Sequence, residues 1–158
     1  MHNIDFKGQL AVITGASRGL GKAFAIGLAE KGASVGIIAR SSSGLKEVGD
    51  IIRNSSGNVV EATCDLLDQD SIDRAIGHIE SQLGDIDILI NNAGIAGPTG
   101  PDWTLDPKEW WKTFEVNVLG QFLVSKAVIS SMVKRGKGRV VNVSSAAAGF
   151  PSANYSAY

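Results

Sequence analysis

The sequence feature that most restricts the fold is a glycine cluster between an apolar run and an amphipathic stretch. Residues 10–13 have the composition of a buried strand, and three glycines fall within residues 14–21 that follow. Residues 22–31 then have the pattern of an amphipathic helix. Backbone N–H groups and the positive end of a helix dipole meet at such a turn, and glycines let an anion approach the backbone. The segment therefore predicts a phosphate or pyrophosphate site; a glycine-rich turn without a ligand is the alternative.

Short apolar runs alternate with helical patterns along the rest of the chain. The pattern predicts strands over residues 10–14, 34–39, 58–63, 86–91 and 139–143, and helices over residues 19–31, 44–54, 69–83 and 107–134. Asp106 is the expected N-cap of the last helix, with Pro107 at its first position. Near-continuous Val, Ile and Leu strands alternating with helices predict an α/β fold. We expect one Rossmann-like domain over residues 1–158, a doubly wound parallel sheet with helices on both faces.

The glycine spacing is Thr-Gly-x-x-x-Gly-x-Gly rather than the common Gly-x-Gly-x-x-Gly of dinucleotide sites. Together with the Asn-Asn-Ala-Gly run at residues 91–94, and with Asn117, Ser145 and Tyr158, this pattern resembles the short-chain dehydrogenase/reductase family. The resemblance covers essentially the whole chain. It implies an oxidoreductase that transfers a hydride between a nicotinamide cofactor and a ketone/secondary alcohol pair.

Composition restricts the partners and the compartment. The chain has 158 residues, is 44% hydrophobic and carries a formal net charge of −1, which argues against nucleic acid or an anionic membrane as partner. We expect no metal site, no signal peptide and no run long enough to span a membrane. The single cysteine, Cys64, excludes an internal disulfide and fits a reducing, cytoplasmic compartment. The basic residues of segment 134–139 are expected to form a solvated helix end.

Two positions favour NADP over NAD. Sites specific for NAD place an acidic residue about 20 residues beyond the glycines, where it binds the ribose 2′-hydroxyl. The second predicted strand instead ends with Ala39 and Arg40, and Arg40 could pair with a 2′-phosphate. Arg18, within the glycine segment, offers a second cation, and in the family basic residues at both positions go with NADP. The alternative is that both are ordinary exposed arginines.

The resemblance implies that the cofactor is held by Gly15, Ser17, Arg18, Gly19, Leu20, Gly21, Arg40, Asp65, Leu66, Asn92, Ala93 and Gly94. In similar enzymes the residue matching Asp65 accepts a hydrogen bond from the adenine amino group; here it could instead cap a turn. The residue matching Asn91 ties neighbouring strands together through its side chain. The loop over residues 94–104 follows a central strand, so it is either part of the ligand site or a turn-rich surface loop.

Carbonyl reduction needs a group that holds the carbonyl oxygen and a group that supplies a proton. By resemblance, these are Ser145 and Tyr158, because the family's Ser-to-Tyr interval fits this pair. Tyr155 fits this interval less well. Ser144 is expected to turn its side chain toward the body of the protein rather than toward the site. Asn117 interrupts an apolar helical run, so its amide either joins a proton relay, as in relatives, or is satisfied by neighbouring backbone.

The sequence departs from the family where a lysine is expected, one helical turn after the tyrosine; no lysine follows Tyr155 or Tyr158. We therefore expect an N-terminal part of a longer enzyme, with the last strand left as an exposed edge. A catalytically inactive NADP-binding or interaction module is the alternative. The full-length form is expected to be a homo-oligomer, a dimer or tetramer. The tryptophans at positions 103, 110 and 111 are interpreted as packing or subunit-interface residues.

Overall fold

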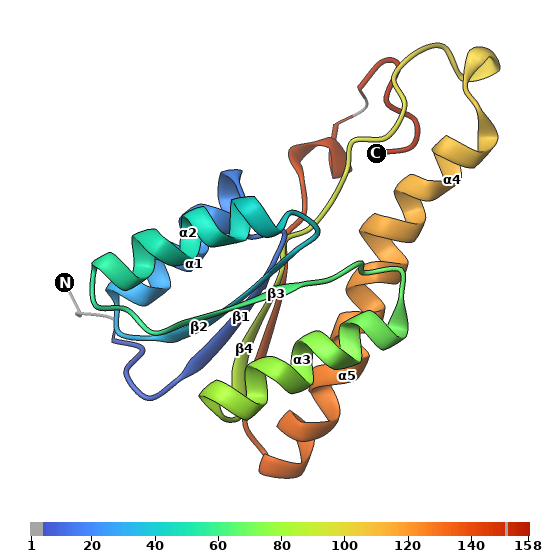
Figure 1. Cartoon of the computed structure of the whole chain (residues 1–158). Helices are drawn as coiled ribbons and strands as arrows, with labels where there is room; N and C mark the ends of the chain where they lie inside the picture. Colours follow the sequence, from blue (N-terminus) through green and yellow to red (C-terminus); the bar gives the residue numbers. More distant parts are fainter. Residues whose placement is uncertain (1–4, 151) are drawn as a thin grey trace.

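A five-stranded parallel sheet forms the centre of the computed structural model, which describes residues 5–150 and 152–158. The strand order is β3-β2-β1-β4-β5 (Figure 1). The strands are β1 (Leu10–Thr14), β2 (Ser34–Ala39), β3 (Val59–Thr63), β4 (Ile86–Asn91) and β5 (Arg139–Asn142). The predicted fold class is confirmed, and each predicted strand is present with its ends displaced by one residue at most.

Helices cover both faces of the sheet, as the alternation of strands and helices predicted (Figure 1). Helices α1 (Gly19–Glu30) and α2 (Ser42–Asn54) pack on one face, and α3 (Gln69–Leu83) and α5 (Gln121–Arg135) on the other. Successive side chains of β1 enter opposite layers, with Leu10 and Val12 in the α3–α5 core and Ala11 and Ile13 in the α1–α2 core. Both faces are buried, which explains why this strand is apolar throughout.

Helix ends follow local side-chain chemistry. Asp106 caps α4 (Pro107–Phe114) by accepting a hydrogen bond from the Lys108 N–H at 2.8 Å, as predicted. Helix α2 begins two residues before the predicted Gly44, because the Ser41 hydroxyl accepts from the Gly44 N–H at 3.2 Å and fixes the first turn there.

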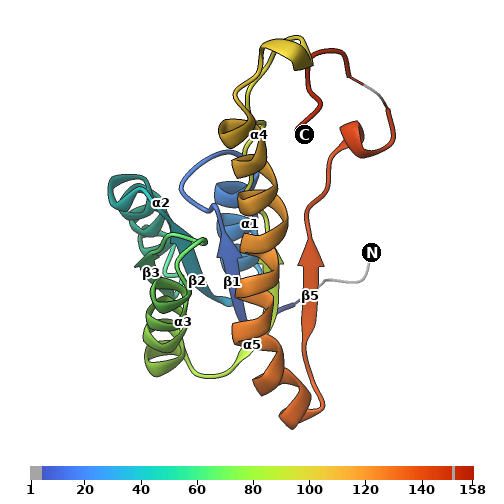
Figure 2. The same ribbon diagram turned by 90° about the vertical axis from the view of Figure 1, so that its right-hand side faces the viewer.

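Helices α4 and α5 are joined without a break by a π-helical segment, Glu115–Gly120 (Figure 2). By length and composition this continuous stretch, Pro107–Arg135, could cross a membrane, because an 18-residue window within it has a mean hydropathy of 1.4. The expectation that no run is long enough was therefore wrong. The buried side chains Val124, Val128 and Met132 belong to the α3–α5 core and cover the sheet, whereas Phe122, Ile129 and Val133 on the same helix are exposed.

Strand β5 pairs only with β4 among the described residues, and all four of its residues are exposed. Val140 and Val141 keep 37% and 47% of their surface accessible, although the sequence pattern is that of a buried strand. The expected exposed edge is thus present at β5.

An acidic residue at the start of β4 pairs with two cations, one at the end of α5 and one two residues after it. Asp87, whose side chain is 8% exposed, accepts from Arg135 Nη1 at 3.2 Å, Lys137 Nζ at 2.9 Å and the Leu10 N–H at 3.2 Å. Burial alone would raise the pKa of Asp87, but the hydrogen bonds from Lys137, Leu10 and Arg135 outweigh it and lower the pKa. The basic segment is therefore only partly a solvated helix end, because two of its cations neutralise Asp87.

Candidate active site

The predicted site residues lie at the carboxyl ends of the strands. They surround the point where the connection after β1 and the connection after β4 run to opposite sides of the sheet. Strand β1 lies between β2 and β4, so the connections after β1 and β4 diverge at this edge. Open α/β sheets bind ligands in the crevice at such a switch point. The glycine turn follows β1, and the segment 92–95 follows β4 directly beside it.

Two glycines of the turn, Gly15 and Gly21, leave no room for a side chain, whereas nothing lies within 4 Å of an added Cβ at Gly19. Gly15 and Gly19 have left-handed backbone conformations, with φ of +66° and +56°. Gly21 is buried, and a Cβ atom there would meet the Gly15 carbonyl oxygen and lie 2.6 Å from Asn92 Nδ2. Gly21 was predicted to hold the cofactor; it lies beneath the turn and allows it to close, whereas the other glycines line the cleft.

Thr14, which the sequence analysis named only as the first residue of the glycine pattern, joins the glycine turn to the segment after β4. The hydroxyl of Thr14, which is fully buried, accepts hydrogen bonds from the N–H groups of Asn92 at 3.0 Å and Ala93 at 3.1 Å. In return, Asn92 Nδ2 donates to the Thr14 carbonyl oxygen at 3.0 Å. A hydroxyl at the end of an otherwise apolar strand was the available signal, but its partners lie 78 and 79 residues away.

A cleft of about 740 Å³, called here the nucleotide cleft, runs across the ends of β1, β2 and β3. Apart from Gly21, every predicted cofactor residue lines it: Gly15, Ser17, Arg18, Gly19, Leu20, Arg40, Asp65, Leu66, Asn92, Ala93 and Gly94. The cleft also takes in residues that the sequence did not single out, namely Leu67, Ile95, Lys112 and Val116. Its volume lies in the usual range of small-molecule sites, about 300–1,000 Å³.

The two arginines of the nucleotide cleft are available for an anion. Arg18 and Arg40 are both exposed, and neither forms an ion pair within the described part of the chain. Ser41 lies beside Arg40 in the same lining. The cleft thus brings together a cation just before α1 and a cation just after β2, as a site for a phosphorylated ligand requires.

Asp65 caps a turn and also faces the nucleotide cleft. Its Oδ1 atom accepts from the Leu67 N–H at 3.1 Å, and its own N–H donates to the Ser71 hydroxyl at 3.3 Å. The prediction that Asp65 caps a turn is therefore correct. It does not exclude a hydrogen bond from the adenine amino group, because Asp65 also lines the cleft. The neighbouring Cys64 is buried, and burial raises the pKa of its thiol, which makes it a poor nucleophile.

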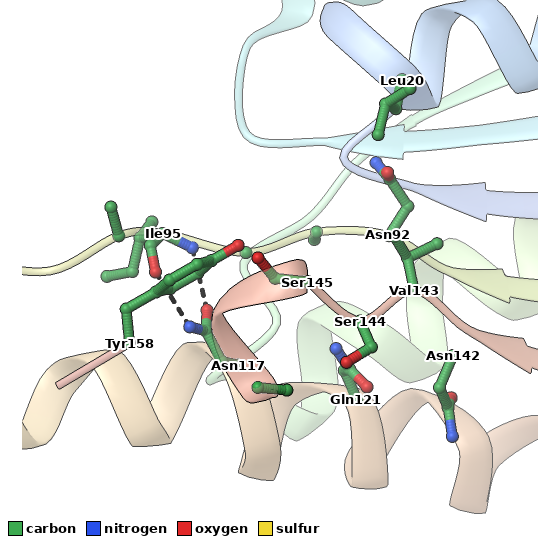
Figure 3. A pocket seen from close by; sticks show the side chains of 14 residues that line it. Leu20, Asn92, Ile95, Asn117, Gln121, Asn142, Val143, Ser144, Ser145 and Tyr158 are labelled. Atoms are coloured by element: carbon green, nitrogen blue, oxygen red, sulfur yellow. Dashed lines mark hydrogen bonds between the residues drawn. The ribbon is translucent and has the colours of Figure 1, made fainter. Parts of the chain in front are cut away.

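A second cleft of about 580 Å³, called here the reaction cleft, lies beside the first, and Figure 3 shows the side chains that line it. Leu20 and residues 92–95 line both clefts, so the two clefts adjoin along this segment. All three predicted catalytic residues, Asn117, Ser145 and Tyr158, line the reaction cleft although they come from three separate segments. Figure 3 shows the hydroxyl groups of Ser145 and Tyr158 pointing toward one another.

Asn117 uses its whole amide to hold the start of the loop after β4. Its Oδ1 atom accepts from the Ile95 N–H at 2.8 Å, and its Nδ2 atom donates to the Ile95 carbonyl oxygen at 2.8 Å (Figure 3). The alternative that the side-chain amide of Asn117 is satisfied by neighbouring backbone is therefore correct. Asn117 also lies in the π-helical segment, where the regular α-helical hydrogen bonds are interrupted. Its role in a proton relay stays a prediction.

The structure also shows which of the two tyrosines and which of the two serines line the reaction cleft. Tyr158 lines the reaction cleft, whereas Tyr155 is absent from its lining. Ser145 lines the cleft while its hydroxyl accepts from the Ala147 N–H at 3.2 Å. Ser144 was expected to face the structure, but it is exposed and also lines the cleft, beside Gln121 (Figure 3). The expectation for Ser144 was wrong because the strand has already ended at Asn142, where strict alternation of side chains stops.

An amide network below the reaction cleft ties β4 to its neighbours. The side chain of Asn91 is fully buried, and its Nδ2 atom donates to Asn142 Oδ1 at 2.8 Å and to the Ser125 hydroxyl at 2.9 Å. Asn91 thus links β4 to both β5 and α5. Its Oδ1 atom has no hydrogen-bond partner among the described residues. No group of three metal-ligating side chains occurs in residues 5–150 and 152–158.

Comparison with known proteins extends the likeness over nearly the whole of this chain. A family model described as short chain dehydrogenase matches residues 9–158. A short chain dehydrogenase of Pseudocercospora fijiensis is 40% identical over 156 residues, which cover 98% of this chain and 50% of that protein. The chain spans about half the length of the curated relatives it matches first.

Solved structures agree with the fold. A xylitol dehydrogenase with bound NAD⁺ superposes with a TM-score of 0.94 at 28% identity, covering 98% of this chain and 60% of that one. A metagenomic short-chain oxidoreductase in complex with NADP superposes with a TM-score of 0.91 at 36% identity, covering 97% of this chain and 69% of that one.

Proposed function

Because this chain belongs to the short-chain dehydrogenase/reductase family, we propose that it is the cofactor-binding and reaction-cleft part of an NADP-dependent oxidoreductase for a ketone/secondary alcohol pair. The observation that carries this proposal is that the two clefts adjoin. Leu20 and residues 92–95 line both, with the glycine turn and two exposed arginines in one cleft and the hydroxyl groups of Ser145 and Tyr158 in the other. A phosphorylated ligand bound in one cleft can therefore extend to the reacting groups in the other.

The residues of the nucleotide cleft fit a dinucleotide. The absence of side chains at Gly15 and Gly19 lets a pyrophosphate approach the backbone at the start of α1, where the helix dipole favours negative charge. Asp65, whose Oδ2 atom remains outside the turn that it caps, can accept from an amino group of the base. When bound, the nicotinamide cofactor supplies or accepts a hydride.

The reaction cleft supplies the groups that bind the substrate oxygen and transfer its proton. The Ser145 hydroxyl can donate a hydrogen bond to a substrate carbonyl oxygen, and the Tyr158 hydroxyl beside it can give a proton to that oxygen or take one from an alcohol. Asn117 holds the Ile95 backbone and thereby shapes the wall of the cleft between the two ends. Buried Cys64 is consistent with our proposal of a reducing, cytoplasmic compartment.

The choice of NADP rests on residues 39–40 and Arg18. Solved relatives include a protein with bound NAD⁺ and a protein in complex with NADP, so family membership alone does not decide the cofactor. In this chain a neutral Ala39 and the exposed Arg40 line the nucleotide cleft at the end of β2. A 2′-phosphate there gains a charge-assisted hydrogen bond, and no carboxylate at position 39 or 40 repels it.

Calorimetric titration of the wild-type chain with NADPH and with NADH tests this choice. We expect tighter binding of NADPH. Arg40→Asp should weaken NADPH binding roughly 10- to 100-fold, the equivalent of a charged hydrogen bond worth about 1.5–3 kcal/mol, and leave NADH binding nearly unchanged. Arg74→Asp, an exposed arginine on α3, is the matched control because it lies outside the nucleotide cleft. Equal losses for both nucleotides, or no loss, would contradict the role of Arg40.

Turnover is a separate question from binding. The assay follows NADPH absorbance with a panel of ketones that includes polyol-derived, cyclic and thioester ketones. Consumption of NADPH that depends on the ketone is the expected result. Binding without any turnover would identify the chain as an NADP-binding module instead.

A further inference from the structure

The two arginines of the nucleotide cleft are carried by two separate segments of the chain. Arg18 directly precedes α1, and Arg40 directly follows β2. Both side chains are exposed, and two guanidinium groups that face the same anion repel each other. A spacing that already exists before the ligand binds increases affinity, because less order is lost on binding. The spacing of the two arginines must therefore be set by contacts between the segments that carry them.

Two polar contacts join these segments, one before the arginines and one after them. The Ala16 N–H donates to the Ile38 carbonyl oxygen at 3.1 Å, two residues before each arginine. Beyond the arginines, Lys22 Nζ on α1 lies 2.6 Å from Glu47 Oε1 on α2. Figure 1 shows α1 and α2 on the same face of the sheet, where their side chains share one core. The two segments are thus joined at both ends.

Between these contacts, the first turn of α2 packs directly on the glycine turn at Gly44. A Cβ atom added to Gly44 would lie 2.9 Å from Ser17 Cβ and 3.3 Å from the Ser17 carbonyl oxygen, whereas ordinary van der Waals contacts begin at 3.4 Å. Gly44 lies within helix α2 and its φ is not positive, so its backbone conformation does not require glycine. Glycine is also unfavourable within a helix. The missing side chain therefore serves close packing against Ser17.

This packing connects the two arginines. Ser17 is the chain neighbour of Arg18, and both line the nucleotide cleft. On the other side, the Gly44 N–H donates to the hydroxyl of Ser41, the chain neighbour of Arg40, at 3.2 Å. Gly44 and Ser41 line the same cleft. A displacement of the first turn of α2 would therefore change the distance between the two cations.

We propose that Gly44 is a positioning residue for the 2′-phosphate of NADP: its missing side chain lets α2 pack on Ser17, and this contact keeps Arg18 and Arg40 at the spacing that one phosphate group needs. The inference rests on the proposed use of NADP. NADH has no 2′-phosphate, so the contact should affect the binding of one nucleotide only.

Gly44→Ala tests the proposal by calorimetric titration with NADPH and with NADH. The methyl group would force α2 away from Ser17 by about 0.5 Å, from 2.9 Å to an ordinary contact distance. We expect NADPH binding to weaken roughly 3- to 10-fold, a part of what a charged hydrogen bond contributes, and NADH binding to change less than about twofold.

Gly77→Ala is the matched control, because it adds a methyl group to helix α3 where nothing lies within 4 Å. It should change the affinity for neither nucleotide. Equal losses for NADPH and NADH in Gly44→Ala would indicate a general structural role and overturn the proposal. No loss for either nucleotide would overturn it as well.

Ser17→Gly shows whether the added methyl group acts through Ser17 or directly on the ligand. This substitution removes the Cβ atom that the methyl group would otherwise meet. In the Ser17→Gly background we expect Gly44→Ala to weaken NADPH binding less than about twofold, because the two positions are coupled. The same 3- to 10-fold loss in both backgrounds would mean that the methyl group touches the ligand itself, and would overturn the positioning role.

The Lys22–Glu47 ion pair provides a second test that does not depend on the folding of Gly44→Ala. Lys22→Met and Glu47→Gln remove the same contact between α1 and α2, but they change the net charge in opposite directions. We expect both to weaken NADPH binding relative to NADH binding by about two- to fivefold, as the energy of an exposed ion pair allows. Opposite effects would reflect charge alone, and either opposite effects or no effect would overturn the proposal.

The same titrations separate this inference from the proposed function. Loss of NADPH affinity in Arg40→Asp without any loss in Gly44→Ala would leave the choice of NADP intact and overturn only the role of Gly44. A wild-type chain that binds NADH as tightly as NADPH would overturn both. None of these measurements requires turnover.

Discussion

Thr14→Val is the substitution whose effect follows most directly from the structure. Valine has nearly the shape of threonine, so the fully buried site stays filled and only the hydroxyl is lost. That hydroxyl accepts from the N–H groups of Asn92 and Ala93, at 3.0 and 3.1 Å. Both amides would lose their acceptor at once, and no side-chain rearrangement of a valine can replace it.

The magnitude depends on how far water can reach these two amides. A buried donor left without a partner costs about 1–3 kcal/mol, so two give about 2–6 kcal/mol. Asn92 and Ala93 are half-buried and line both clefts, so water can reach them in part and the lower end of the range applies. We therefore expect a loss of about 2–3 kcal/mol, which corresponds to a shift of the urea midpoint by about 1–2 M.

Urea unfolding followed by circular dichroism measures this loss, with Thr63→Val as the matched control. Thr63 also ends a strand of the same sheet, but it is exposed at the end of β3. Thr14→Val should also weaken nucleotide binding, because the segment after β4 lines the nucleotide cleft. Equal stability of the Thr14→Val and Thr63→Val variants would refute the argument that this hydroxyl joins the glycine turn to the segment after β4.

Two further substitutions test other contacts. Asp87→Asn should lower the unfolding free energy at pH 7 by about 1–3 kcal/mol, because charged hydrogen bonds are lost. The native pKa of Asp87 is lowered, so its contribution to the unfolding free energy is fully present above the unfolded pKa of about 3.9 and disappears as the pH falls through the native pKa. The difference in unfolding free energy between wild type and variant should therefore close below about pH 4 in urea titrations. A difference that stays constant with pH would contradict this. Gly21→Ala should destabilise the fold by about 1–3 kcal/mol through contact with the Gly15 oxygen and Asn92. Gly27→Ala in the same helix, where nothing lies within 4 Å of an added Cβ, should be neutral or stabilising by up to about 1 kcal/mol in thermal unfolding, and equal losses would refute the packing argument.

The sequence alone determined those features that depend on neighbouring residues. The strand Leu10–Thr14 and the helix Gln69–Leu83 were predicted with their observed bounds, because apolar periodicity and capping are local properties. The Asp106 cap of α4 was predicted correctly for the same reason. The glycine turn was identified from its spacing, since close approach of an anion needs glycine at fixed offsets from a helix start.

The tertiary structure alone decided the contacts between residues that are distant in the sequence. Thr14 and Ala93 meet across 79 positions, Asp87 and Arg135 across 48, and Asn117 and Ile95 across 22. No local pattern encodes such pairs, because each depends on the order of strands in the sheet and on the course of the α4–α5 helix. The sequence therefore identified the hydroxyl and amide groups of the site. Only the packed sheet showed which of these groups hold the fold together and which face the clefts.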